Sequence, residues 1–255
     1  KGSQVFSQQD HRYMALAIKL AKQGHYTTSP NPRVGCVLVN NAKGKMQIIG
    51  LGFHQKAGQG HAEVNALADA RLTNVSLIKG ATAYVTLEPC SHFGRTPPCA
   101  QALINAGVKR VVAAMVDPNP DVSGRGLAML EQAGITAEFG LLENEAAALN
   151  RGFIKRMRTG KPWVTVKLAA SLDGKTALEN GLSQWITGPL ARQDVQRHRA
   201  RSCAILSGSG TVTADDPLLN VRYSELNLAD DVLSQKDLRQ PLRVLLDGRN
   251  QLPSS

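Results

Sequence analysis

The chain has 255 residues, of which 42% are hydrophobic and 20% charged, and its formal net charge is +10 at pH 7. This composition is typical of a globular protein with one large or two ordinary domains, and four cysteines are too few for a disulfide scaffold. The positive charge is spread over both halves and aromatic residues make up only 4%, which disfavours a nucleic-acid binder and fits small phosphorylated ligands equally well.

The sequence also bears on the cellular compartment. No apolar run approaches the roughly 18 residues that a membrane-spanning helix needs. The polar start, residues 1–10, lacks the apolar centre of a signal peptide. We therefore expect a cytoplasmic protein that binds neither a membrane nor nucleic acid.

The first sixty residues predict a helix, a rigid loop and a pair of strands. Apolar residues at helical spacing indicate a helix over residues 10–23, and two prolines stiffen the loop 27–32. A buried strand over residues 34–39 is expected to pair with a second strand over residues 47–51. His54 follows in a glycine-rich segment, where a surface loop histidine is favoured over a substrate contact.

Strands and helices alternate over the next hundred residues. A helix begins near His61, a β-type run over residues 81–87 leads into Glu88-Pro89-Cys90, and Thr96 is placed to cap a helix that contains Cys99 in its first turn. The remaining predicted elements are a strand (110–115), a helix (126–133), a strand (135–139) and a helix (143–157). This alternation predicts a three-layer α/β domain.

A domain boundary is predicted near residues 158–162, which separates residues 1–157 from residues 158–255. The second unit is predicted to contain strands over residues 163–169, 203–207 and 243–247 and a helix over residues 189–200. Only about 95 residues remain for it, which is short for an α/β domain with a cofactor site. We therefore expect this second domain to be incomplete as given.

His61, Cys90 and Cys99 form a candidate zinc site. One imidazole and two thiolates suit Zn²⁺ and disfavour the hard, oxygen-seeking cations. Three protein ligands leave the fourth tetrahedral position open for water, as in catalytic zinc sites. The alternatives are a closed structural site with a fourth protein ligand, or three unrelated residues.

Glu63 lies two residues after His61 and is interpreted as the general acid and base rather than as a ligand. A carboxylate there can take a proton from the activated water and deliver it to a leaving amine. Zinc deaminases of nucleobases combine a His-x-Glu segment with a Pro-Cys-x-x-Cys segment in this way. In this chain eight residues, rather than two, separate the cysteines.

Six motifs are spread over both halves of the chain. In the first half they are Pro30-Asn-Pro-Arg-Val-Gly35, His61-Ala-Glu63 and Thr86-Leu-Glu-Pro-Cys-Ser-His-Phe-Gly-Arg-Thr-Pro-Pro-Cys99. In the second half they are Lys167-Leu-Ala-Ala-Ser-Leu-Asp-Gly-Lys175, Ser183-Gln-Trp-Ile-Thr187 and Gly208-Ser-Gly-Thr-Val-Thr-Ala-Asp-Asp-Pro217. Together they resemble the bifunctional deaminase/reductase of bacterial riboflavin biosynthesis. The long loop between the cysteines is similar to that family and differs from general cytidine, guanine and tRNA-adenosine deaminases.

For the first domain the resemblance implies a cytidine-deaminase-like α/β/α fold. It implies zinc-dependent hydrolytic deamination of 2,5-diamino-6-(5-phosphoribosylamino)pyrimidin-4-one. Asn31, His92 and Arg95 then correspond to the contacts with the pyrimidine and its phosphate, which suits an amide and a guanidinium. Alternatively, Asn31 only holds its turn, and His92 and Arg95 only brace the loop between the cysteines.

For the second domain the resemblance implies a dihydrofolate-reductase-like α/β fold that reduces the ribosyl group to ribityl with NADPH. The residues that correspond to cofactor contacts are Ala169, Trp185, Thr211 and Asp215. Those that correspond to substrate contacts are Lys167, Ser183, Arg199, Leu219 and Arg222. The segment 208–211 is a candidate phosphate cradle, and the alternative for the two arginines is a solvated surface position. A homo-oligomer, namely a dimer, is expected.

Two other functions compete with this hypothesis. One is a zinc deaminase that acts on a base in tRNA or single-stranded nucleic acid. The other is a nucleic-acid-binding module that zinc stabilises without catalysis, in which Glu63 would have no chemical role.

Overall fold

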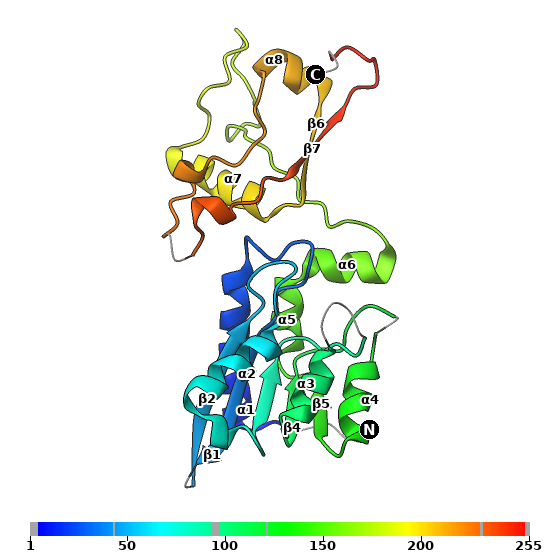
Figure 1. Ribbon diagram of the computed structural model, residues 1–255. Coiled ribbons are helices and arrows are strands. Elements are labelled where there is room, and N and C mark those ends of the chain that lie inside the picture. The colour runs from blue at the N-terminus through cyan, green and yellow to red at the C-terminus, as the bar shows by residue number, and fades with distance from the viewer. Residues whose placement is uncertain (1–4, 43, 93–96, 121, 230–231, 253–255) are drawn as a thin grey trace. The chain divides into compact units, whose positions relative to one another are not determined.

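A computed structural model describes residues 5–42, 44–92, 97–120, 122–229 and 232–252. The chain divides into two compact units, Lys1–Trp163 and Val164–Ser255 (Figure 1). Among the described residues, no helix combines the length and the apolar character that crossing a membrane requires.

The first unit is a five-stranded sheet between two layers of helices. Its strands are β1 (Gly35–Ala42), β2 (Lys45–Phe53), β3 (Thr82–Val85), β4 (Arg110–Ala113) and β5 (Thr136–Phe139). Its α-helices are α1 (Gln8–Ala21), α2 (Ala62–Thr73), α3 (Cys99–Asn105), α4 (Arg125–Gln132), α5 (Glu143–Leu149) and α6 (Arg151–Thr159), and its 3-10 helices are η1 (Lys22–Gly24) and η2 (Val75–Leu77).

The strand order is β2-β1-β3-β4-β5. The predicted hairpin of β1 and β2 is confirmed: the two strands are antiparallel, with Gly35 opposite Phe53 and Ala42 opposite Lys45. β3, β4 and β5 run parallel, and β1 is antiparallel to β3. The carboxyl ends of β3 and β4 therefore meet at one edge of the sheet, where sites in α/β domains form.

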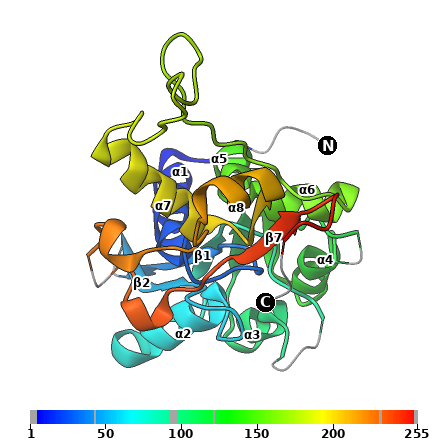
Figure 2. The same cartoon turned by 90° about the horizontal axis from the view of Figure 1, so that it is seen from above.

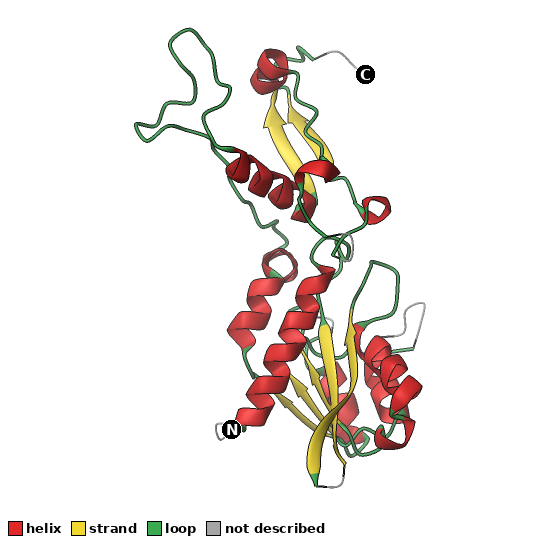
Figure 3. Ribbon diagram, turned by 90° about the vertical axis from the view of Figure 1, so that its left-hand side faces the viewer, coloured by secondary structure: helices red, strands yellow, loops and turns green. Residues whose placement is uncertain are grey.

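Alternating side chains along the strands build one core on each face of the sheet. Cys36 and Leu38 of β1 point into a cluster with residues of α2, α3 and α4, whereas Val37 and Val39 point into a cluster with residues of α1 and α5. The helices accordingly flank the sheet on both sides (Figure 2, Figure 3). The predicted three-layer α/β/α architecture is confirmed.

Glycine allows α2 to pack closely on β2. A Cβ atom added at Gly52 would lie 2.3 Å from the carbonyl oxygen of Ala62 and 2.3 Å from the backbone nitrogen of Ala66. Any side chain there would push away the first turn of α2. Because His61 directly precedes this turn, the close packing also determines where His61 lies.

The prediction of one continuous helix over residues 143–157 is wrong, because the chain breaks between α5 and α6 at Asn150. The backbone of Asn150 leaves the helical region, with φ −123° and ψ 31°. Its side-chain oxygen accepts from the backbone N–H of Arg33, and its amide group donates to the backbone carbonyl of Arg33, each at 2.8 Å. This paired contact joins the break to the loop before β1, a partner that local helical periodicity does not reveal.

The second unit has a two-stranded parallel sheet of β6 (Ala204–Gly208) and β7 (Leu242–Leu246). Its helices are α7 (Pro189–Arg201), α8 (Ser209–Asp215), η3 (Tyr223–Glu225) and η4 (Gln235–Asp237). The predicted strand over residues 163–169 is wrong: the segment has no regular structure and, among the described residues, pairs with neither strand. Alternating apolar residues form a strand only where a neighbouring strand accepts their backbone hydrogen bonds.

Candidate active site

His61, Cys90 and Cys99 converge at the edge of the first sheet. His61 is the N-cap of α2, Cys90 follows β3, and Cys99 is the first residue of α3. Nδ1 of His61 lies 3.2 Å from Sγ of Cys99 and 3.7 Å from Sγ of Cys90. All three potential ligand atoms lie within 4.8 Å of one another. Thus three segments that are far apart in the sequence supply one cluster.

The cluster fits the geometry of a tetrahedral zinc ion. With Zn–S about 2.3 Å and Zn–N about 2.0–2.1 Å, the ligand atoms would be separated by roughly 3.6–3.8 Å. The observed separations lie near this range. Cys99 is buried, Cys90 is half-buried and His61 is exposed, so the cluster opens to solvent on the histidine side. Such an arrangement leaves room for a water or substrate atom at a fourth position.

The thiols of Cys90 and Cys99 have pKa values shifted in opposite directions. Hydrogen bonding with Cys99 lowers the pKa of Cys90, aided by a hydrogen bond with His61. Hydrogen bonding with Cys90 and burial raise the pKa of Cys99. The backbone N–H of Cys99 also donates to Sγ of Cys90 at 3.2 Å. The cluster therefore stabilises one thiolate readily and requires a cation to stabilise the second.

Glu63 is buried beside this cluster, with 3% of its surface exposed. It is the second residue of α2, one position past Ala62, so the helix start directs its carboxyl group to the same region as His61. Burial raises the pKa of Glu63 to about 7, and hydrogen bonding with Cys99 works in the opposite direction. A carboxyl group with a pKa near neutrality can both accept and release a proton at physiological pH.

His54 is not the surface loop histidine that was expected; only 3% of it is exposed. Its ring packs edge-on against that of His61, with centroids 5.5 Å apart. Nδ1 of His54 lies 3.1 Å from the carbonyl oxygen of Gly60, and Nε2 lies 3.2 Å from Nδ2 of Asn31. Burial lowers the pKa of His54, which favours the neutral ring.

These contacts determine the tautomer of His54 and the orientation of Asn31. A carbonyl oxygen only accepts, so Nδ1 of His54 carries the proton and Nε2 accepts from the Asn31 amide group. Oδ1 of Asn31 then remains as an acceptor for another partner. Sequence reasoning missed His54, because a histidine in a glycine-rich segment carries no signal of the burial that packing against His61 creates.

The loop between the two cysteines is described only in part. His92 is exposed near its start. Burial raises the pKa of Asp117, and the nearby His92 acts in the opposite direction. Arg95 and the predicted helix cap Thr96 lie outside the described residues. The N-cap of α3 is Pro98, so the prediction of Thr96 as the cap is wrong.

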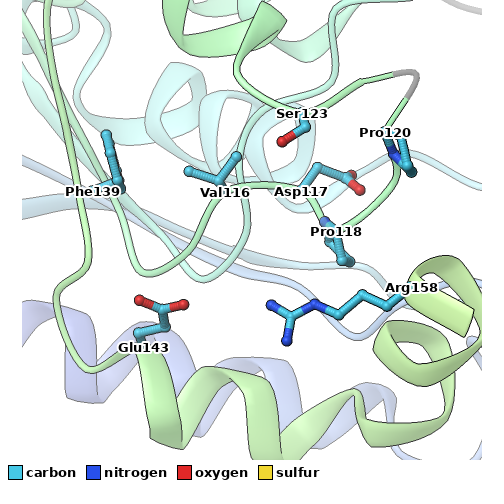
Figure 4. A pocket seen from close by; sticks show the side chains of 8 residues that line it. All are labelled: Val116, Asp117, Pro118, Pro120, Ser123, Phe139, Glu143 and Arg158. Atoms are coloured by element: carbon cyan, nitrogen blue, oxygen red, sulfur yellow. The ribbon is translucent and has the colours of Figure 1, made fainter.

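A cavity of about 380 Å³ lies along the loop that follows β4. It is lined by Val116, Asp117, Pro118, Pro120, Ser123, Phe139, Glu143 and Arg158. Figure 4 shows the side chain of Arg158 extending toward Glu143 below the loop that bears Asp117. The zinc-ligand candidates His61, Cys90 and Cys99 do not line this cavity.

In the second unit, Arg199, Leu219 and Arg222 are brought together. Nη1 of Arg199 donates to the carbonyl oxygen of Asn220, at 2.9 Å, next to the buried Leu219. Burial and the charge of Arg222 lower the pKa of Arg199, and Arg222 is paired with Glu225. Arg222 is exposed, as the alternative of a solvated surface arginine expects, whereas Arg199 is half-buried.

The other predicted contacts of the second unit are more dispersed. Thr211 and Asp215 lie one turn apart on α8, which begins directly after Gly208, the first residue of the candidate phosphate cradle 208–211. Trp185 stacks against the guanidinium of Arg192, 4.3 Å from its ring centroid. Lys167, Ala169 and Ser183 lie in segments without regular structure.

Comparison with known proteins matches the two units to two families. Residues 7–115 match the cytidine and deoxycytidylate deaminase zinc-binding region. Residues 162–255 match the RibD C-terminal domain. The predicted fold classes, a cytidine-deaminase-like domain followed by a dihydrofolate-reductase-like α/β domain, are confirmed.

The chain is also similar to curated relatives that are longer than it is. The riboflavin biosynthesis protein RibD of Escherichia coli is 58% identical over 245 residues, which cover 96% of this chain and 65% of the relative. That of Haemophilus influenzae is 57% identical over 249 residues, covering 97% and 64%. The chain thus spans slightly less than two thirds of the length of these curated relatives.

Solved structures show the same likeness. The structure of Acinetobacter baumannii RibD in form 1 has a TM-score of 0.87 and 54% identity to this chain. The match covers 96% of this chain and 65% of the Acinetobacter baumannii chain. A Thermotoga maritima diaminohydroxyphosphoribosylaminopyrimidine deaminase/5-amino-6-(5-phosphoribosylamino)uracil reductase has a TM-score of 0.83 and 41% identity, with the same coverage.

Proposed function

We propose that this chain, which belongs to the RibD family of riboflavin biosynthesis proteins, deaminates 2,5-diamino-6-(5-phosphoribosylamino)pyrimidin-4-one by hydrolysis. The deaminase domain comprises residues 1–157. Residues 158–255 belong to a domain that reduces the ribosyl group of the deaminated product to ribityl with NADPH. The working form is a cytoplasmic homodimer that acts on a small phosphorylated pyrimidine.

One observation carries the deaminase proposal: the buried Glu63 lies beside three ligand atoms within 4.8 Å of one another, and the site is open on the side of His61. A closed structural zinc site would need a fourth protein ligand, and among the described residues the cluster contains three. A purely structural site would also gain nothing from a buried carboxyl group with a pKa near 7.

The residues of the cluster divide the work of hydrolysis. When bound, Zn²⁺ lowers the pKa of a coordinated water toward neutrality. His61, Cys90 and Cys99 would hold the ion, and Glu63 accepts the proton of the attacking water on its carboxylate. The same carboxyl group then delivers that proton to the departing amino group, so that ammonia leaves uncharged. Oδ1 of Asn31 accepts a hydrogen bond from a ring N–H or amino group of the pyrimidine. His54 holds the Asn31 amide in place. His92 and Arg95 bind the phosphate side of the substrate.

The deaminase proposal predicts a narrow substrate range. The zinc-loaded chain is expected to release ammonia from the diaminopyrimidine phosphate and none from cytidine, guanine or RNA oligonucleotides. Ammonia is measured with a coupled enzymatic assay, and zinc content is determined on the same sample. Removal of zinc with a chelator is expected to abolish release, and added zinc to restore it. Turnover of an RNA oligonucleotide, with none of the phosphorylated pyrimidine, would instead support a nucleic-acid deaminase.

The reductase proposal assigns Ala169, Trp185, Thr211 and Asp215 to NADPH and Lys167, Ser183, Arg199, Leu219 and Arg222 to the substrate. We expect Asp215→Ala to weaken NADPH binding about 10- to 100-fold, since a lost charge-assisted hydrogen bond is worth roughly 1.5–3 kcal/mol. Asp216→Ala is the matched control, because this neighbouring aspartate is also exposed and is not among the assigned contacts. Nicotinamide fluorescence measures both dissociation constants. Equal weakening by the two variants would contradict the assignment of Asp215.

A further inference from the structure

Glu88 is a buried carboxylate two residues before the ligand candidate Cys90. Only 3% of its surface is exposed. Oε2 accepts hydrogen bonds from the backbone N–H groups of Asp117 and Gly124, both at 2.9 Å. Oε1 accepts from those of Gly126 at 2.8 Å and Leu127 at 3.3 Å. One side chain thus satisfies four backbone donors of a segment that lies about thirty to forty residues further along the chain.

Two of these donors belong to the first turn of α4. Gly126 and Leu127 are the second and third residues of that helix, whose N-cap is Gly124, a residue without a side chain that could cap it. The first N–H groups of a helix have no partner within the helix and favour a negative charge. Glu88 therefore caps α4 from the segment that follows β3, and it also holds Asp117 in the segment that follows β4.

The same helix supports the backbone on the other side of Glu88. A Cβ atom added at Gly126 would lie 1.9 Å from the carbonyl oxygen of Pro89. Pro89 thus packs directly on the first turn of α4. The backbone N–H of Glu88 donates to the carbonyl oxygen of Met115 at 3.0 Å, which joins the ends of β3 and β4. Residues 88 and 89 are held from three directions just before Cys90.

Cys90 depends on this support. On the other side of Cys90, its carbonyl oxygen accepts from the backbone N–H of Ala100 in α3 at 3.2 Å. His92, two residues after Cys90, is exposed. The position of Sγ of Cys90, 3.7 Å from Nδ1 of His61, is therefore fixed by Glu88 and Pro89 on one side and by α3 on the other.

We propose that Glu88 is a positioning residue for zinc binding: its four hydrogen bonds to residues 117–127 hold Cys90 where it completes the ligand set with His61 and Cys99. This inference rests on the proposed zinc-dependent function. The metal-ligand geometry of such sites depends on partners that do not touch the metal, and loss of such a partner typically lowers metal affinity about 10- to 100-fold.

Glu88→Gln in the whole chain tests the proposal. The amide has one oxygen, so its nitrogen must face a pair of backbone N–H donors that a carboxylate oxygen accepted. We expect the variant to release zinc to a competing chelator about 10- to 100-fold faster than the parent chain. Loaded with Co²⁺ instead, it should show an altered visible spectrum, because that spectrum depends on the coordination geometry of the ion.

Glu138→Gln is the matched control. Glu138 lies on β5, which β4 separates from β3, and its carboxylate accepts from Nε of Arg110 on β4 at 2.6 Å. Its replacement by glutamine makes the same chemical change. Its zinc release should stay within about twofold of the parent rate. Gly126→Ala is a second test that keeps the carboxylate of Glu88: the added Cβ would lie 1.9 Å from the carbonyl oxygen of Pro89 and 3.1 Å from Oε1 of Glu88, so it disturbs the same support. It should also accelerate release, and it decides the question should Glu88→Gln fail to fold.

The outcomes separate the proposal from the function on which it rests. Equal release from the parent chain, Glu88→Gln and Gly126→Ala would overturn the positioning role and leave zinc catalysis intact. Equally accelerated release from Glu88→Gln and Glu138→Gln would also overturn it, because general destabilisation would then explain the loss. A parent chain that takes up no zinc would overturn the proposed function itself, and with it this inference.

Discussion

Replacing Glu63 by glutamine is expected to lower kcat for ammonia release by about 10²- to 10⁴-fold while zinc stays bound. Glutamine has nearly the same size and can occupy the same buried space, but it cannot accept a proton from water. The ligand atoms of His61, Cys90 and Cys99 remain unchanged. Ammonia release and zinc content, measured on the same preparation, test both halves of this expectation.

Glu145→Gln is a suitable control for this variant, because Glu145 lies exposed on the first turn of α5 and makes the same chemical change far from the cluster in the sequence. It should retain full activity. A Glu63→Gln variant with undiminished turnover would contradict the assigned role of Glu63. Loss of zinc from the variant would instead show that Glu63 supports the structure of the metal site.

Asp10→Ala is expected to lower the free energy of unfolding of the first unit by about 2–4 kcal/mol. Asp10 is 5% exposed, and its carboxylate accepts from Nη1 of Arg110 at 2.6 Å, from the hydroxyl of Tyr84 at 2.7 Å and from Ser7. Alanine leaves the guanidinium and the buried hydroxyl without this partner. Urea unfolding measures the loss, and Glu138→Gln should cost less, since Glu138 is a more exposed partner of Arg110.

The contribution of Asp10 should depend on pH. Burial raises the pKa of Asp10, but hydrogen bonds from Arg110, Tyr84 and Ser7 outweigh it and hold the pKa well below its usual range. A carboxyl group whose pKa is depressed by folding stabilises the folded state above its unfolded pKa, about 3.9, and loses this contribution as the pH falls below that value. The difference in stability between the parent chain and Asp10→Ala should therefore shrink between about pH 5 and pH 3. A constant difference would show that Asp10 contributes through packing rather than through its charge.

The sequence was most informative where chemistry is local. An imidazole and two thiols with a nearby glutamate indicate zinc hydrolysis before any fold is known, because few metals prefer these ligands. Regular alternation of apolar runs likewise predicted the elements of the first sheet, since each strand buries both faces between helices. The predicted elements failed where a distant partner decides: Asn150 ends α5 by bonding the backbone of Arg33, and the segment 163–169 lacks a partner strand.

By itself, therefore, the sequence determined the types of ligand, the α/β class and the family resemblance, all of which depend on residue identity and short spacing. Only the tertiary structure decided which side chains support the site. His54 became a buried partner of Asn31 because the loop before α2 folds onto it, and Glu88 became the cap of α4 because parallel strands bring their carboxyl ends together. Such contacts join residues about twenty to forty positions apart, and no local pattern encodes a hydrogen bond to a backbone that arrives from another part of the fold.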